Sequence, residues 1–226
     1  YGMMRVGSES TPFFGSAVLS GLSFLSTAVL LPHAKPAGGT ARPAPTFELF
    51  RRPEARRRLL EFFLYNLSFS TFIGGFALFL QAQFGFDQKK SSLMFVYTGV
   101  IGAIIQGGLL GRLVKRLGEE KLALAGFVAM AVGHFFLGWI HWIWVLLVIG
   151  VISNFGIAVT RPALTTLITK SVGRDEQGKA LGMGTTLASL SQIIGPPCAG
   201  WLIEHRKLHA YGALVGALAA GGAALM

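Results

Sequence analysis

Long apolar runs of about twenty residues alternate with short polar connectors along most of the chain. A helix needs about 20 mostly apolar residues to cross the hydrocarbon layer of a membrane. The pattern therefore predicts an all-α membrane protein, a bundle of spanning helices. The predicted spans are residues 12–31, 60–83, 91–111, 122–140, 142–168, 180–203 and 211 onward.

The connector between the third and fourth spans is short and basic, and it contains Arg112, Lys115, Arg116 and Lys121. A turn this short predicts that the two helices are antiparallel neighbours. Basic residues also gather in 32–59 and 169–179, whereas the alternate connectors carry few. Because cytoplasmic loops are rich in Lys and Arg, these three connectors are predicted to be cytoplasmic. We expect a multi-pass protein of the cytoplasmic (plasma) membrane, surrounded by lipid.

Composition narrows the functional classes. The chain is 52% hydrophobic and 13% charged, with a formal net charge of +10 that falls mostly in the connectors. This distribution argues against a nucleic-acid partner. The single cysteine, Cys198, excludes an internal disulfide and cannot by itself form a metal site. No hydrolytic triad, phosphate loop or dinucleotide fingerprint occurs, so we expect neither an enzyme nor a cofactor or metal.

Segment 46–61 has two interpretations. Phe47, Leu49 and Phe50 lead into Arg56-Arg57-Arg58, which is typical of a basic amphipathic helix at a membrane surface. A solvated linker is the alternative.

Glycine and proline mark expected packing sites. Gly107-x-x-x-Gly111 and Gly212-x-x-x-Gly216 each place two small residues on one helix face, which lets backbones approach closely. Gly74-Gly75 and Gly195-Pro196-Pro197 are expected to interrupt their helices within the membrane.

Three spans carry stripes of polar or small residues at helical spacing. Such stripes face the bundle interior or a water-filled cavity. Hydrogen bonding between helices is the alternative to a solute pathway. The stripes are Asn66, Ser70, Gly74, Ala77 and Gln81; Asn154, Arg161 and Thr165; and Thr185, Ser189 and Gln192. The candidates for lining a pathway are Asn66, Ser70, Gln81, Asn154 and Gln192.

Two ionisable residues lie inside predicted spans. Arg161 either extends to the membrane interface or has a buried role. His134 is a candidate proton relay, because an unperturbed histidine titrates near physiological pH. Alternatively, His134 donates one hydrogen bond to a neighbouring helix.

The order Gly111-x-x-x-Lys115-Arg116-x-Gly118 resembles the G-x-x-x-D-R-x-G loop signature of the major facilitator superfamily, with Lys115 at the acidic position. Segments 173–182 and 191–200 are similar to the loop before the family's eleventh helix and to that helix itself. Thr11-Pro12-Phe13-Phe14 and the basic linker look like the sixth helix and the central loop. The chain is most similar to the tetracycline-resistance-like, drug:proton antiporter branch.

The resemblance implies the C-terminal half of the family fold plus one preceding helix. Residues 1–31 would be the last helix of the N-terminal half, 32–59 the cytoplasmic central linker, and 60–226 a six-helix half truncated at its end. The N-terminal half is then a partner missing from this chain, which begins at Tyr1 and stops within an apolar run. Gly111, Lys115, Arg116 and Gly118 would form a gating loop.

The implied function is secondary active transport of a small organic solute or drug by alternating access, with proton-coupled antiport as the expected mode. The small-molecule substrate and protons would be its partners. A heptahelical receptor or retinal protein is an alternative, although no lysine for a retinal lies between Tyr211 and Met226. A transporter-like scaffold without transport is the other alternative.

Overall fold

The computed structural model describes residues 11–30 and 48–226. It divides into two units, residues 1–44 and residues 45–226. In the first, α2 runs over Thr11–Leu30, on the first predicted span. The linker residues before 48, with Lys35 and Arg42 of the predicted basic segment, lie outside the described residues.

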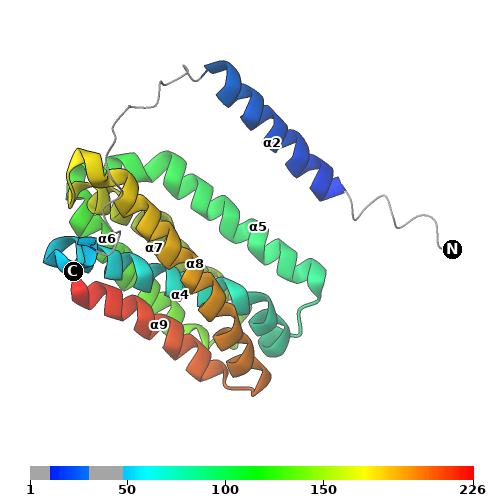
Figure 1. The fold of residues 1–226 in the computed structure, drawn as a ribbon. Coiled ribbons are helices and arrows are strands. Elements are labelled where there is room, and N and C mark those ends of the chain that lie inside the picture. The colour runs from blue at the N-terminus through cyan, green and yellow to red at the C-terminus, as the bar shows by residue number, and fades with distance from the viewer. Residues whose placement is uncertain (1–10, 31–47) are drawn as a thin grey trace. The chain divides into compact units, whose positions relative to one another are not determined.

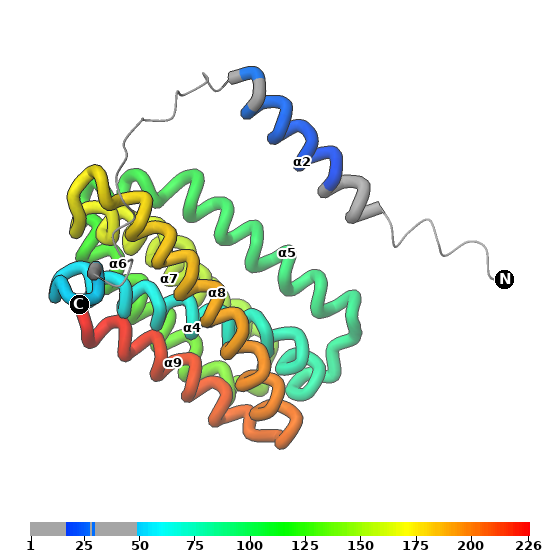
Figure 2. The backbone as a smooth tube through the Cα atoms, in the orientation of Figure 1, coloured from blue at the N-terminus to red at the C-terminus, as the bar shows by residue number. Residues whose placement is uncertain are grey.

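The second unit is a bundle of helices and contains no strand among its described residues (Figures 1 and 2). Each remaining predicted span falls on helical segments, and span 91–111 runs over α5, η1 and the first residues of α6. The elements are α3 (Glu48–Arg51), α4 (Pro53–Phe84), α5 (Gln88–Ile104), the π-helix η1 (Ile105–Leu109), α6 (Leu110–Leu137), α7 (Ile143–Lys170), the 3₁₀ turn η2 (Arg174–Glu176), α8 (Gln177–Glu204) and α9 (Leu208–Leu225).

Helix α4 begins well before the predicted span. Pro53 stands at its first position, where the missing N–H costs nothing, and Arg52 before it is extended. Segment 46–61 is therefore not one amphipathic helix, because Pro53 separates α3 from α4. At the other end Gly85 takes φ 64°, and its N–H donates to the Gln81 carbonyl at 3.0 Å. This left-handed cap ends the helix.

The basic connector 112–121 is shorter in the structure than the sequence indicates. Helix continues through Arg112 to Leu117, and the chain turns back at Gly118, with φ 74° and ψ 164°. Only glycine adopts this backbone conformation without strain. The prediction that the two helices pack side by side is not met over most of their length. Helix α5 packs on α7 instead. The segments before and after the turn meet only near it, where Ile105 of η1 and Leu122 of α6 belong to one hydrophobic cluster.

Glycines set the closest helix contacts. A Cβ on Gly156 of α7 would lie 2.5 Å from the Gly126 carbonyl oxygen of α6, so the two backbones touch. Gly212 and Gly216 bring α9 equally close to α6, which confirms the packing predicted for that pair. A Cβ on Gly107, by contrast, would meet open space.

The expected interruptions of α4 and α8 are wrong. Both helices run unbroken through Gly74-Gly75 and through Pro196-Pro197. A Cβ on Gly74 would lie 2.7 Å from the Pro196 side chain. The two motifs therefore serve as the contact surface between α4 and α8, where the small glycine accommodates the proline ring.

The outer surface suits a bilayer. Stretches long and apolar enough to cross a membrane are Pro53–Phe84, Gln88–Leu137, Ile143–Lys170 and Leu208–Leu225, and the 50-residue stretch supplies two spans because it turns at Gly118. Trp139, Trp142, Trp144 and Trp201 are exposed around the α6–α7 and α8–α9 connections. Tryptophans at this level anchor a helical bundle at the membrane–water boundary.

Candidate functional site: a polar hollow beside Arg161

A hollow with a volume of about 630 Å³ opens beside α7. This volume lies within the range of sites that bind drug-sized molecules. Polar groups and apolar side chains share its wall, which comes from α4, η1, α6 and α7. The lining residues are Tyr65, Phe69, Gln106, Leu110, Ile157, Arg161, Pro162, Thr165 and Thr166.

Irregular backbone shapes this hollow from two sides. Gln106 belongs to the π-helix, a wider turn that is common at functional positions. Pro162, inside α7, has no N–H to donate to the carbonyl four residues earlier. The Thr165 hydroxyl donates to the Arg161 carbonyl at 2.9 Å, and that of Thr166 to the Pro162 carbonyl at 3.1 Å. These bonds use the hydroxyl protons, so each hydroxyl oxygen is left as an acceptor only.

The predicted pathway residues do not share one hollow. Asn66 is buried and donates to the Phe62 carbonyl of its own helix at 2.7 Å. Ser70 is buried where α4 meets α8. Asn154 is buried, donates to the Gly150 carbonyl and lines a narrow internal gap.

Gln81 and Gln192 are exposed. Gln81 lines two hollows near the tryptophan end of the bundle, of about 350 and 440 Å³. Gln192 continues an exposed polar stripe on α8 with Thr185 and Ser189. A role in the pathway stays a prediction for all five residues.

His134 is fully enclosed. Its ring lies 4.5 Å from that of Phe72, centroid to centroid, and neither ring nitrogen has a hydrogen-bond partner within the described part of the chain. The interhelical hydrogen bond offered as its alternative role is absent there. A relay needs a bonded donor or acceptor, so a relay through His134 requires a conformation that opens the ring to water. That role stays a prediction.

In the predicted gating loop, the two cations lie on the surface and the ion pairs are made by the acids that follow. Lys115 and Arg116 are exposed, and within residues 11–30 and 48–226 neither has an ion-pair partner. The acids that follow Gly118 make the contacts instead. Glu119 pairs with Lys170 of α7 at 2.6 Å, and Glu120 pairs with Arg58 of α4 at 2.7 Å.

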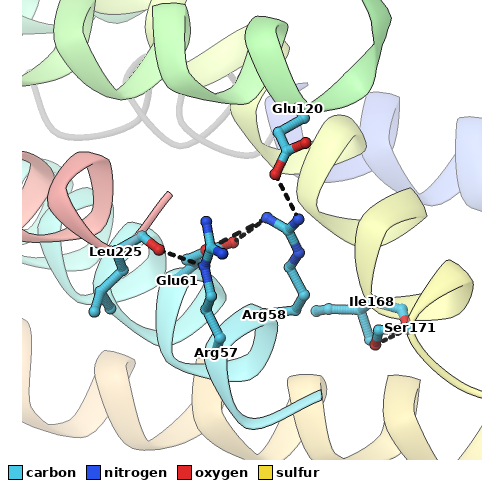
Figure 3. A network of polar contacts seen from close by, with 7 residues as sticks. All are labelled: Arg57, Arg58, Glu61, Glu120, Ile168, Ser171 and Leu225. Carbon is cyan, nitrogen blue, oxygen red and sulfur yellow. Dashed lines mark hydrogen bonds and ion pairs between the residues drawn. The ribbon is translucent and has the colours of Figure 1, made fainter. Parts of the chain in front are cut away.

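Arg58 is the centre of a network at this basic end (Figure 3). Its guanidinium bonds Glu61, whose side chain is fully buried, at 3.1 Å, as well as Glu120. Arg57 also bonds Glu61, at 3.1 Å, and donates to the Leu225 carbonyl. The network therefore joins α4, the start of the segment after Gly118, and the end of α9.

A second pair secures the turn before α8. Arg52 donates to both carboxylate oxygens of Glu176, at 2.5 and 3.0 Å. This hydrogen bond lowers the pKa of Glu176 from its ordinary value of 4.5. A lowered pKa in the folded state stabilises the fold above about pH 4.5, and that contribution is lost as the pH falls through the folded pKa. Both groups are partly exposed, so the effect is small.

Sequence reasoning missed one feature of this hollow and one feature of the basic end of the bundle. Gln106 was assigned to the end of a regular span, because no periodicity distinguishes one wide turn from an α-helix. Glu119 and Glu120 were overlooked beside the basic residues of the same connector. Their position directly after a turn glycine was the available signal.

Comparison with known proteins agrees with the loop resemblance. A sequence model of the Major Facilitator Superfamily matches residues 62–226. The chain is 29% identical over 202 residues to a class G tetracycline resistance protein of Vibrio anguillarum, covering 86% of this chain and 51% of that protein. It is 28% identical over 198 residues to multidrug resistance protein 1 of Bacillus subtilis, covering 85% and 50%.

A third relative is the quinolone resistance protein NorA of Staphylococcus aureus, 25% identical over 211 residues, covering 90% of this chain and 53% of that protein. The chain thus spans about half the length of the curated relatives it matches. The similarity predicted from the loop signature is confirmed.

Proposed function

The chain belongs to the Major Facilitator Superfamily, and from this we propose that the protein carries small drug-like organic solutes across the membrane by alternating access, in exchange for protons. The observation that carries the proposal is the hollow of about 630 Å³ beside Arg161, a polar opening on a helix that lies in the membrane. Exposed polar groups at that depth are costly unless they border a water-filled path. The printed names of the relatives, which concern resistance to tetracyclines, quinolones and several drugs, favour a drug as the solute.

Motion of the bundle would use its basic end. In transporters of this kind, two halves rock around a site near the membrane midplane. The pairs Glu119–Lys170 and Glu120–Arg58 hold the segment after Gly118 against α7 and α4. Lys115 and Arg116, on the other side of Gly118, remain available for a contact that forms in one state of the cycle. The gating role of these residues is part of the proposal.

The proposal is tested in cells that lack their own efflux pumps and express the intact protein. Such cells should retain less tetracycline or quinolone than cells with an empty vector. A protonophore should abolish the difference, because it removes the gradient that drives exchange. Equal retention, with the protein present in the membrane, would refute drug export.

His134 supplies a prediction for stability as well as for coupling. His134→Leu removes a buried group whose nitrogens lack partners, and an unpaired buried polar group costs about 1–3 kcal/mol. We expect a higher thermal unfolding temperature in detergent. His205→Leu, which removes an exposed ring that hydrogen-bonds the Trp201 carbonyl at 2.8 Å, should not raise it. His134→Leu also tests the relay: a transport rate with unaltered pH dependence would remove His134 from proton coupling.

A further inference from the structure

Arg161 lies within the membrane-length helix α7 and borders open space. It stands nine residues before Lys170, the last residue of α7, which places it about 13 Å from that end at about 1.5 Å per residue. Its side chain is exposed and borders the hollow. A charged group at this depth must be compensated by a partner or by water. One predicted role of Arg161 was that its side chain extends to the membrane interface. Even in that role, Arg161 would still line the hollow.

The neighbouring acids do not supply that partner. Among the described residues, Arg161 has no hydrogen bond from its side chain and no ion pair. Among the described carboxylates at the same end of the bundle, Glu54 and Asp175 form no ion pair with Arg161 or any other cation, and the other four are held by other cations. Glu61 is paired with Arg57 and Arg58, Glu119 with Lys170, Glu120 with Arg58, and Glu176 with Arg52.

Arg161 gives the wall its unused positive charge and unused hydrogen-bond donors. The hydroxyl protons of Thr165 and Thr166 go to their own helix, and Tyr65 donates its hydroxyl to the Ile157 carbonyl at 3.2 Å. The guanidinium of Arg161 and the amide of Gln106 have no partner in the part of the chain that the structure describes. Free donors with a fixed positive charge select an anion, and a guanidinium matches a carboxylate through two parallel bonds.

Apolar side chains complete the wall. Phe69 and Leu110 lie beside the donors and offer an aromatic and an aliphatic surface. A ligand that satisfies both parts carries one carboxylate on an apolar, drug-sized body. We propose that Arg161 is the specificity-determining residue of this hollow and that it binds the carboxylate of an organic-acid substrate, with Gln106 as a second donor. This inference rests on the proposed transport function and adds the chemical class of the substrate.

The test compares acids with their own esters in the intact protein, purified and reconstituted in liposomes. The probes are benzoate-, naphthoate- and quinolone-type carboxylic acids and the methyl ester of each. We expect Arg161→Gln to raise KM and Kd for a transported acid about 10- to 100-fold, because it removes a charge-assisted contact. Values for the ester should stay within about threefold, given that no charge pair is lost. Arg161→Lys keeps the positive charge but cannot form the two parallel hydrogen bonds of a guanidinium, so its KM and Kd for the acid should lie between those of the wild type and Arg161→Gln.

Arg174→Gln is the matched control, since it removes an exposed arginine in the turn before α8. Retained ester transport shows that the Arg161 variants are folded. A parallel loss for acid and ester would overturn the inference and indicate that Arg161 pairs with another part of the protein. Failure of every acid to bind the wild-type protein would also overturn it. Binding that depends on Arg161 without any flux would keep the inference and reject the transport function.

Discussion

Arg58→Gln is expected to lower the stability of the bundle by about 3 kcal/mol, because it leaves the buried carboxylate of Glu61 with one cation fewer. Removing one partner of a buried ion pair costs about 3–5 kcal/mol, and the remaining bond from Arg57 places this site at the lower end. Thermal unfolding of the purified intact protein in detergent measures the change. The network in Figure 3 links three helices, so we also expect faster proteolysis at the basic end.

Two companion variants isolate the charge effect. Glu120→Gln changes a carboxylate that is 57% exposed and should cost less than about 1 kcal/mol. The double variant Arg58→Gln/Glu61→Gln should be more stable than Arg58→Gln alone, since no unpaired charge stays buried. If the double variant is the less stable of the two, the network is not held together by charge pairing.

Gly156→Ala should separate α6 from α7, the most extensive helix pair of the bundle. The added methyl would lie 2.5 Å from the Gly126 carbonyl oxygen and 2.9 Å from the Met130 nitrogen, and backbone cannot move aside as a side-chain tip can. We expect a loss of about 1–3 kcal/mol, the usual cost of overpacking. The unfolding temperature and the yield of monodisperse protein report it.

Gly200→Ala on α8 is the control for this substitution. A Cβ there meets open space, so the change should be neutral or should stabilise the helix by up to about 1 kcal/mol through propensity alone. Equal behaviour of the two variants would mean that Gly156 is not a contact point.

The sequence predicted the helices well because most of them contain one strong local signal, a run of apolar residues long enough to cross a bilayer. It also identified Gly212 and Gly216 as a close-packing pair. The same spacing at Gly107 and Gly111 was misleading, because a Cβ at either position would meet open space. Proline and glycine inside α8 were read as a break. The structure shows a continuous helix, in which the Pro196 ring packs against Gly74 of the neighbouring helix.

The site was harder to predict, because it depends on which helix faces lie together. Asn66 and Asn154 are polar residues of the kind expected to line a solute pathway. In the structure, each side-chain amide donates to a carbonyl of its own helix. Arg161 was noticed, but the lack of an ion pair between it and any described acid is a property of the folded bundle. Whether the five predicted pathway residues touch a solute stays a prediction, as does the division of the chain into helix, linker and transporter half.

The central claim is exchange of a drug-like solute for protons, and flux in proteoliposomes tests it most directly. The purified intact protein is reconstituted, a pH gradient is imposed with no other driving force, and movement of a labelled tetracycline or quinolone is followed. The account predicts accumulation against the solute gradient, on the more acidic side, that collapses when a protonophore is added. Solute movement that ignores the pH gradient, or no movement by a protein that binds the solute, would contradict it.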